Sequence, residues 1–448
     1  MKNVALYNLG CKVNSYEMEV MRQSFEEKGY RIVPFGEKAD IYIINTCTVT
    51  NIADRKSRQM LHRARQLNPD AVVVAAGCYV QTGLDAIKKD DSIDLAVGNN
   101  RKKDIVDLVE TYLAEHQDKT LHGAAVLDIS HTCEYEEMQL KRTAEHTRAY
   151  IKIQDGCNQF CSYCAIPYAR GRVRSRRPED ILREIRGMVA AGYREVVLTG
   201  IHISSYGIDQ GGDSRYNGSS KLIDLTEQIH KTEGLERIRL GSLEPRIIRE
   251  ETAERLAAMP KLCPHFHLSL QSGCDATLKR MNRHYTAGQY YASVETLRKF
   301  FDNPAVTTDV IVGFPGETEE EFFETKEFLE KVHFYEMHVF KYSKRAGTAA
   351  AVMTDQIPEA TKAQRSNVLL ELSRRQSMEF RRHYIGREAE VLLEEVRETG
   401  GDTFLIGHTK DYVKVAVRVT DAGPSRELSP NVLVKVPVKG FLTDEILV

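Results

Sequence analysis

The sequence contains no hydrophobic segment long enough to cross a membrane. Its longest apolar runs, such as AVVVAAG at Ala71–Gly77, are far shorter than the roughly 20 residues that a membrane-spanning helix needs. The first residues, MKNVALYNLGCK, have only a brief apolar stretch and no small-residue cleavage site after it, unlike a signal peptide. We therefore expect a cytoplasmic protein without a membrane partner.

The chain also lacks a large net charge and a disulfide framework. The formal charge is −2, so any binding of nucleic acid must use local patches. Nine cysteines in 448 residues do not make a disulfide scaffold, and an odd number cannot pair completely. In a reducing compartment, clustered thiols indicate metal or redox chemistry. The length predicts about two to four domains.

Short apolar strands alternate with polar helical stretches in the first part of the chain. This alternation predicts an N-terminal open parallel α/β domain over residues 1–114. Cys11, Cys47 and Cys78 each follow an expected strand, in the sequences YNLGC, IINTC and VAAGC. Because the carboxyl ends of parallel strands share one edge of a sheet, these cysteines are expected to meet there. A metal site and three buried small side chains both fit this pattern.

The rest of the chain divides into three further segments. Residues 115–142 show no clear period and are predicted to be a linker. Six strand–helix repeats over residues 143–374 predict a partial (β/α)6 barrel, with its chemistry at the carboxyl ends of the strands. Alternating apolar residues over 375–441, interrupted by Gly and Pro, predict a small antiparallel β-barrel. The predicted fold class is α/β with this barrel appended.

Two helices of the N-terminal domain can be placed from the pattern of the sequence. One is expected over Tyr16–Lys28 and the other over Asp54–Leu67, where Asp54 is a suitable N-cap.

The strongest motif is DGCNQFCSYCAIP, which contains Cys157, Cys161 and Cys164 after the first barrel strand. Three close thiolates suit an iron–sulfur cluster or zinc. A structural zinc site would need a fourth ligand nearby, but the next histidine is His202. Three ligands on a four-iron cluster leave one iron open to a small molecule. We interpret the motif as a catalytic [4Fe–4S] site, and a non-catalytic, zinc-bearing RNA-binding protein remains the alternative.

This loop resembles the CxxxCx(aromatic)C motif of the radical S-adenosylmethionine (SAM) superfamily, with Tyr163 as the aromatic residue. The resemblance implies that the open iron binds SAM and that its cleavage yields a 5′-deoxyadenosyl radical. Later segments, VVLTGIHI, GSLEP, LSLQSG and DVIVGFPGET, resemble the cofactor motifs of the superfamily. The implied SAM site is lined by Tyr163, Thr199, Gly200, Glu244, Ser269, Gln271 and Gly313. A strand-end turn at Gly200 and a helix-start carboxylate at Glu244 are the simpler alternatives.

Further motifs resemble the methylthiotransferase family within this superfamily. Three of these motifs, LGCKVNSYE, NTCTVT and GCYVQ, lie near the N-terminus, and the fourth, YSKRAGTAA, follows the barrel. The expected C-terminal strands resemble a TRAM domain, which is a small RNA-binding barrel. The resemblance implies that Cys11, Cys47 and Cys78 hold a second [4Fe–4S] cluster, whose free iron carries sulfur. One SAM would methylate this sulfur, and a second would supply the radical that removes a hydrogen atom from an unactivated carbon.

The motif LGCKVNSYE, with Lys12 and Val13, most resembles the corresponding segment of the bacterial enzymes that act on N6-threonylcarbamoyladenosine in tRNA. It implies that a 2-methylthio group is added at position 37, next to the anticodon. Isopentenyladenosine in tRNA and an aspartate of a ribosomal protein are the alternative substrates. The implied partners are the tRNA anticodon stem-loop, an external electron donor and a sulfur source.

Two groups of basic residues could bind RNA. Arg170, Arg172 and Arg174 follow the cysteine loop and suit phosphate contacts, although carboxylates of the next helix could pair with such arginines instead. The second group lies in Asp54–Leu67 and is either an RNA-binding surface or a solvated helix face, with Arg55, Lys56, Arg58, Arg63 and Arg65.

Overall fold

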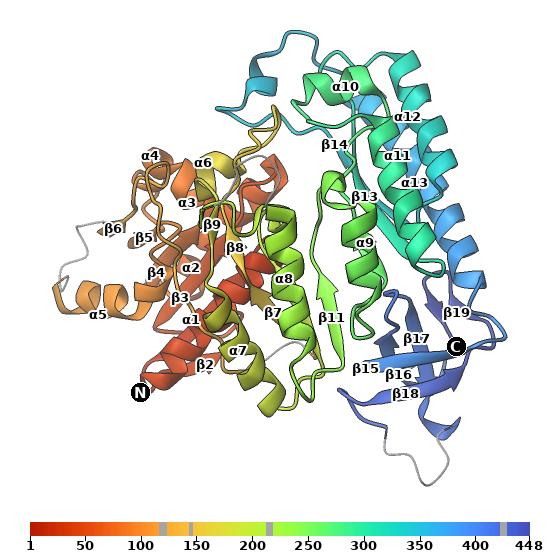
Figure 1. The fold of residues 1–448 in the computed structure, drawn as a ribbon. Helices are drawn as coiled ribbons and strands as arrows, with labels where there is room; N and C mark the ends of the chain where they lie inside the picture. The colour runs from red at the N-terminus through yellow and green to blue at the C-terminus, as the bar shows by residue number, and fades with distance from the viewer. Residues whose placement is uncertain (116–122, 143–146, 212–217, 422–427) are drawn as a thin grey trace.

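The computed structural model describes residues 1–115, 123–142, 147–211, 218–421 and 428–448. The chain forms an N-terminal α/β domain, a central parallel barrel and a C-terminal, mainly antiparallel sheet (Figure 1). This is the predicted fold class. None of the described helices combines the length and the apolarity that crossing a membrane requires.

The N-terminal sheet has parallel strands in the order β2-β1-β3-β4-β5-β6. Alternate side chains of β3 enter different cores, because successive residues of a strand face opposite sides. Ile41 and Ile43 join the core that contains α1, whereas Tyr42 and Ile44 join the core that contains α2. The elements are β1 (Asn3–Asn8), α1 (Lys12–Glu27), β2 (Arg31–Val33), β3 (Ile41–Thr46), α2 (Asn51–Leu67), β4 (Val72–Gly77), α3 (Cys78–Thr82), α4 (Leu84–Ile87), β5 (Leu95–Val97), α5 (Ile105–Glu115) and β6 (Gly123–Ala125).

The register of this sheet aligns the ends of three strands. Asn8 of β1 pairs with Asn45 of β3, and Asn45 pairs with Ala76 of β4. The residues that follow these strands therefore begin at the same edge of the sheet.

Local details differ from the sequence prediction. Strand β6 pairs with β5 and so places part of the predicted linker in the N-terminal sheet, while residues 116–122 lie outside the described part of the chain. Thr50, not Asp54, caps α2, because the Thr50 side chain accepts a hydrogen bond from the Ala53 N–H at 3.2 Å. Asp54 instead pairs with Arg345 at 2.6 Å.

Six parallel strands form the central partial barrel, as predicted. They make two sheets, β11-β10-β7 and β12-β13-β14, which isolated bridges at Ile238↔Leu262 and Leu243↔Leu268 connect. The strands are β7 (Ala149–Lys152), β10 (Glu195–Thr199), β11 (Arg237–Leu240), β12 (His265–His267), β13 (Ala305–Val312) and β14 (Glu336–Lys341). The helices are α6 (Ile166–Arg170), α7 (Pro178–Ala190), α8 (Gly218–His230), α9 (Glu250–Ala257), α10 (Asp275–Arg280), α11 (Ala287–Phe300), α12 (Glu319–Val332) and α13 (Glu359–Arg382).

A short antiparallel pair, β8 (Gln154–Asp155) and β9 (Arg174–Ser175), brackets the cysteine loop at the carboxyl end of β7. The loop is therefore held on both sides at the end of the barrel where chemistry is expected.

The C-terminal sheet packs against the amino ends of the barrel strands. Arg237 and Arg239 of β11 donate hydrogen bonds to the carbonyl oxygens of His408 (2.9 Å) and Lys410 (2.8 Å). The strands of this sheet are β15 (Glu388–Thr399), β16 (Asp402–His408), β17 (Lys414–Arg418), β18 (Leu433–Pro437), β19 (Phe441–Thr443) and β20 (Ile446–Leu447).

Candidate metal centres

Cys11, Cys47 and Cys78 lie together at the carboxyl edge of the N-terminal sheet. Cys11 is the N-cap of α1, Cys47 follows β3, and Cys78 is the first residue of α3. A Cβ atom added to Gly10 would lie 3.1 Å from the Cys47 sulfur, so the first two cysteines approach closely. Burial raises the pKa of the Cys47 thiol to about 11, and the charges of the nearby Cys78 and Cys11 contribute to this rise. The structure thus brings together the cysteines that the strand pattern singled out.

A glycine allows Cys78 to start its helix at this edge. Gly77 has a φ of 97°, which side-chain-bearing residues rarely adopt. An added Cβ at this position would lie 2.7 Å from the Asn45 side-chain oxygen and 2.9 Å from the Thr46 carbonyl oxygen. The Asn99 amide nitrogen lies 3.5 Å from the Cys78 sulfur. This thiol is therefore held by a turn that only glycine fits.

Cys157, Cys161 and Cys164 occupy the loop between β8 and α6. The Cys157 N–H donates to the Gly171 carbonyl at 3.0 Å, and the Cys164 N–H donates to the Cys161 carbonyl at 2.9 Å. Burial raises the pKa of the Cys157 thiol to about 11 and that of Cys164 to about 12, with a contribution from the charge of Cys161. Thiols in such an environment are neutral until a metal displaces their protons.

The spacing of the thiols tests which metal group they fit. Within the described residues, the one group of three ligand atoms that lie within 4.8 Å of one another is His267, Asp309 and His338. Neither cysteine triad is that tight. Thiolates around a single tetrahedral zinc would lie only about 3.8 Å apart, given Zn–S bonds of about 2.3 Å. Sulfur-only donor sets with wider spacing fit an iron–sulfur cluster better than zinc.

The residues predicted to line the SAM site lie around the carboxyl end of the barrel. Tyr163 packs on the apolar cluster of Met281, Phe314 and Tyr342. Thr199 ends β10, and Gly200 follows where an added Cβ would lie 2.9 Å from the Gln154 side-chain oxygen.

The remaining predicted SAM residues follow strands β11 to β13. Glu244 accepts a hydrogen bond from Arg246 at 2.5 Å, and the Ser269 carbonyl accepts one from the Tyr285 hydroxyl at 2.6 Å. Gln271 has a φ of 76° and Gly313 a φ of 69°, so both stand at sharp turns of the chain. Their roles in binding SAM stay predictions.

Arg283 is a site residue that the sequence prediction missed. Its guanidinium donates to the Cys161 sulfur at 3.2 Å and lies 4.8 Å from the centre of the Tyr285 ring. Arg280 lies three residues earlier, at the end of α10, but pairs with Glu321 instead. Nothing in the sequence distinguishes these two arginines, because the difference comes from the fold around them.

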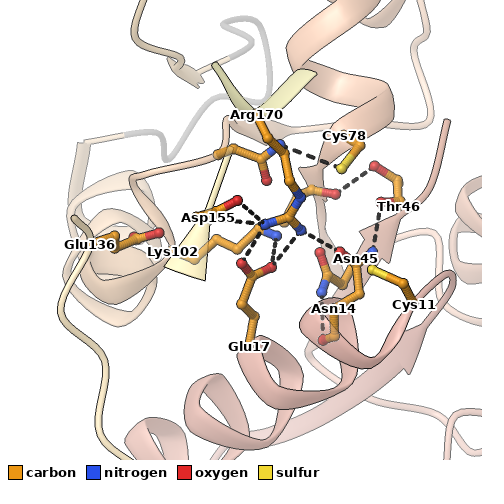
Figure 2. A network of polar contacts seen from close by, with 12 residues as sticks. Cys11, Asn14, Glu17, Asn45, Thr46, Cys78, Lys102, Glu136, Asp155 and Arg170 are labelled. Atoms are coloured by element: carbon orange, nitrogen blue, oxygen red, sulfur yellow. Dashed lines mark hydrogen bonds and ion pairs between the residues drawn. The ribbon is translucent and has the colours of Figure 1, made fainter. Parts of the chain in front are cut away.

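A buried ionic network joins the two cysteine-bearing regions. Arg170, from the helix after the barrel loop, donates to Glu17 of α1 at 2.7 Å and to Asp155 at 3.0 Å. It also donates to the Asn14 side-chain oxygen at 2.5 Å, and Lys152 donates to Glu17 at 2.7 Å. Figure 2 shows Arg170 between Glu17, Asp155 and Asn14, with Cys78 on one side. This network ties α1, which Cys11 caps, to the barrel.

The charges in this network compensate one another. Burial alone would raise the pKa of Glu17, but the charges of Arg170, Lys102 and Lys152 hold it well below its usual range. Lys102 also contacts Glu17 directly. The carboxylate is therefore ionised and fully paired, which is the condition for keeping a charge inside a protein.

The arginine run after the barrel loop differs from its predicted role. Arg170 is completely buried in the network, and Arg174 is 1% exposed and donates to the carbonyl oxygens of Arg170 and Arg172. Neither can reach RNA phosphates in this structure, because both guanidiniums are enclosed by protein. Arg172 is exposed, and its guanidinium lies 4.4 Å from the centre of the Phe160 ring. It remains the candidate of this group for RNA binding.

Comparisons with known proteins give the same class of protein as the fold and the cysteine loop. The model of the radical SAM superfamily matches residues 151–329, and that of the uncharacterized protein family UPF0004 matches residues 3–98. A radical SAM methyltransferase from Kitasatospora setae, solved with cobalamin and a [4Fe–4S] cluster, aligns with a TM-score of 0.57 at 18% identity, over 79% of this chain and 74% of that one. At this identity the likeness concerns the fold. Fold, family match and cysteine loop together define a radical SAM protein.

Relatives with higher sequence identity show to which family of the radical SAM superfamily the chain belongs. A protein of Bacillus subtilis named threonylcarbamoyladenosine tRNA methylthiotransferase MtaB is 42% identical over 94% of this chain and 91% of its own length. Its namesake from Aquifex aeolicus is 39% identical over 88% of this chain and 93% of its own length. A tRNA-2-methylthio-N(6)-dimethylallyladenosine synthase of Carboxydothermus hydrogenoformans is 36% identical over 91% of each chain. The chain belongs to the radical SAM methylthiotransferase family, which confirms the prediction from its motifs. SAM and [4Fe–4S] clusters are the cofactors of this class.

Proposed function

We propose that the protein adds a 2-methylthio group to N6-threonylcarbamoyladenosine at position 37 of tRNA, by radical SAM chemistry. Relatives that carry this activity in their names support the proposal, since they match nearly the whole chain at up to 42% identity. The observation that carries it is the presence of two three-cysteine sites in one molecule, joined through Arg170. One triad alone would suit many radical SAM reactions, whereas sulfur insertion needs a second site.

In this proposal each triad holds one [4Fe–4S] cluster. The ligands are Cys157, Cys161 and Cys164 for the barrel cluster, and Cys11, Cys47 and Cys78 for the N-terminal cluster. When bound, the clusters and SAM supply the electron, the radical and the sulfur that side chains cannot supply. The SAM pocket is formed by Tyr163, Thr199, Gly200, Glu244, Ser269, Gln271 and Gly313.

The chain itself positions these groups. Arg283, 3.2 Å from the Cys161 sulfur, stabilises negative charge on that thiolate. The network of Arg170, Glu17 and Asp155 fixes α1 against the barrel. Rigid placement matters, because reacting atoms must meet within a fraction of an ångström for efficient transfer.

A basic surface beside the N-terminal triad suits the RNA substrate. Arg55, Arg58 and Arg63 of α2 are exposed and lie with His62 along one face of the helix. The helix starts at Asn51, whose side chain donates to the Lys344 carbonyl at 3.1 Å next to the barrel rim. Phosphates of an anticodon stem-loop could follow this surface to the site. We further propose a cytoplasmic enzyme that receives electrons and sulfur from external donors.

Nucleoside mass spectrometry of tRNA tests the proposal. Cells without the gene should lose 2-methylthio-N6-threonylcarbamoyladenosine and keep the unthiolated parent nucleoside, and a plasmid copy should restore the product. Loss of methylthiolated isopentenyladenosine instead would show the other tRNA substrate. Unchanged tRNA nucleosides would contradict the proposed function.

A further inference from the structure

Two histidines and an aspartate lie together on neighbouring strands of the barrel. His267 ends β12, Asp309 lies within β13, and His338 lies within β14. Asp309 pairs directly with His338 in the parallel ladder of β13 and β14 (Figure 1). One ligand atom from each of the three side chains lies within 4.8 Å of the other two. These side chains, called the His–Asp–His group below, belong to neither cysteine triad and are not among the predicted SAM residues.

The His–Asp–His group faces the interior of the barrel. On β13, Val310 belongs to the same core as Leu297 of α11 and Leu329 of α12, so it points towards the surrounding helices. Asp309 precedes Val310 and lies on the other face, because successive residues of a strand face opposite sides. The three members of the group are partly buried or exposed. They are therefore not part of the packing between the barrel and its helices.

Hydrogen bonds and packing place the group directly below the predicted SAM site. The N–H of Gln271, one of the predicted SAM residues, donates to the Asp309 carbonyl at 2.9 Å. Ile311 shares the face of Asp309 and packs in one apolar cluster with Tyr163 of the cysteine loop. Two residues of a strand span about 7 Å, so Asp309 lies about that far below Ile311. The group is thus close to the end of the barrel where chemistry is expected.

The spacing of His267 and Asp309 suits two ligands of one metal ion. The His267 Nε2 and Asp309 Oδ2 atoms are 3.3 Å apart. A hydrogen bond between nitrogen and oxygen usually measures about 2.9 Å. Two ligands of a tetrahedral zinc ion, each bound at about 2.0–2.1 Å, lie about 3.3–3.4 Å apart. The two atoms therefore already have the separation that a shared ion requires.

The two imidazole rings are held in place beside Asp309. The His267 Nδ1 atom lies 3.0 Å from the Thr307 hydroxyl oxygen, which leaves Nε2 turned to Asp309. A partner on the second ring nitrogen is typical of histidines that bind metals. The His338 ring stacks on the His267 ring with the ring centres 5.7 Å apart. Within the part of the chain that the structure describes, His338 makes no hydrogen bond, so its ring nitrogens are available to an ion.

We propose that His267, Asp309 and His338 bind a divalent transition-metal ion inside the barrel, in addition to the two iron–sulfur clusters. Two imidazoles and one carboxylate are a common donor set for such ions, and the carboxylate offsets part of their charge. Three protein ligands leave one position of a tetrahedral ion open to water or to an oxygen atom of a substrate. The inference does not depend on which nucleoside the enzyme modifies.

Zinc binding to the reconstituted protein tests this proposal. Protein with both clusters loaded is incubated anaerobically with Zn²⁺, desalted, and analysed for zinc and iron by mass spectrometry. The wild type should retain about one zinc per chain beside its iron. X-ray absorption at the zinc edge should show nitrogen and oxygen neighbours at about 2.0–2.1 Å and no sulfur at about 2.3 Å. The spectrum separates the proposed site from zinc that occupies an unloaded cysteine triad.

Substitutions assign the zinc to the His–Asp–His group. Asp309→Asn and His338→Phe each remove one ligand with little change in size. Loss of an outer partner of a ligand lowers metal affinity about 10- to 100-fold, so loss of a ligand should lower it at least about 100-fold. Thr307→Val removes only the contact to His267 and should weaken zinc binding about 10- to 100-fold. His131→Ala is the matched control, because His131 is exposed and lies outside the group. Competition with a chromophoric chelator measures the affinities.

Each result supports or overturns the proposal. Zn²⁺ binds nitrogen and oxygen ligands more tightly than Mn²⁺ or Fe²⁺ does, so a wild type that retains no zinc would overturn it. Sulfur neighbours in the absorption spectrum, or unchanged zinc affinity in the ligand variants, would also overturn it. Circular dichroism identifies which ligand variant keeps the wild-type fold, and the affinity of that variant decides. Methylthiolation is not the readout, so a negative result here leaves the proposed function intact.

Discussion

The two cysteine triads are built in different ways. Cys157, Cys161 and Cys164 lie within one short loop, which backbone hydrogen bonds and the β8–β9 pair hold in place. Cys11 and Cys78 are far apart in sequence and meet because the register of the parallel strands aligns the strand ends. The barrel triad is thus a local structure, whereas the N-terminal triad depends on the fold of a whole domain and on its contact with the barrel.

Because the two triads are built differently, different substitutions should disturb them. Substitutions far from any thiol should disturb the N-terminal triad, because Glu17 and Arg170 fix α1 below Cys11. The barrel triad should be sensitive mainly to its own loop and to Arg283. The sites also differ in their arginines. Those after the barrel loop are mostly internal, whereas Arg55, Arg58 and Arg63 of α2 are exposed, and Arg65 of the same helix is partly buried and pairs with Asp94 at 2.6 Å.

The largest effect is expected when one thiol of either triad is removed. Cys47→Ala should abolish methylthiolation and leave reductive cleavage of SAM measurable, because the barrel triad remains intact. Cys161→Ala should abolish both reactions. Chromatography of 5′-deoxyadenosine and mass spectrometry of tRNA nucleosides provide the two measurements.

Cys133→Ala is the matched control, because Cys133 is exposed and belongs to neither triad. It should behave as the wild type in both assays. Methylthiolation at the wild-type rate in Cys47→Ala would refute a role of the N-terminal triad in sulfur transfer.

Removal of Glu17 should have the next largest effect. Glu17→Ala leaves the buried cations Arg170, Lys102 and Lys152 without their shared carboxylate. Breaking a buried ion pair typically costs about 3–5 kcal/mol, so the free energy of unfolding should fall by about that amount. Urea denaturation followed by circular dichroism measures the change.

Glu27→Ala on the same helix is the control, because Glu27 is half exposed and pairs with exposed Lys141. A surface pair of this kind contributes about 0–1 kcal/mol. Equal urea midpoints for the two variants would mean that the internal network does not hold α1 against the barrel.

Substitution of the α2 arginines should have the smallest effect. Arg55 and Arg63 are exposed and make no ion pair with described residues, so the double variant Arg55→Ser/Arg63→Ser should keep its fold and bind tRNA several-fold more weakly. The slope of log affinity against log salt should fall by about 1 per lost phosphate contact. Filter binding across a salt series measures both quantities.

Arg186→Ser on α7 provides the comparison, because Arg186 is also exposed but lies on a helix that carries no cysteine of either triad. It should leave tRNA affinity unchanged. If both variants weaken binding equally, α2 is not a specific RNA surface.

The fold and the grouping of the cysteines could be predicted from the sequence, because apolar strands and the cysteines that follow them can be recognised without knowing which side chains pack together. Fully buried strands such as β3 and β4 appear as unbroken apolar runs, and cysteines at strand ends follow from the parallel topology. The start of α1 was placed too late, at Tyr16 instead of Lys12. The first turn buries Asn14 in polar contacts, so no apolar period marks it.

Charged residues were harder to place. Arg170 and Arg174 look like a surface patch in the sequence, since arginine is seldom fully buried. Their carboxylate partners, Glu17 and Asp155, are distributed over two domains, so only the folded chain shows the pairing. The same reason hides Arg283, whose contact with Cys161 joins segments more than a hundred residues apart.

Iron stoichiometry tests the central claim, that each triad holds a separate cluster. Anaerobically reconstituted wild type should bind about eight irons per chain, as two four-iron clusters require. Replacing all three N-terminal ligands, Cys11→Ala, Cys47→Ala and Cys78→Ala, should leave about four irons and SAM cleavage. A wild type that binds only four irons, or a triple variant that keeps all eight, would contradict the account.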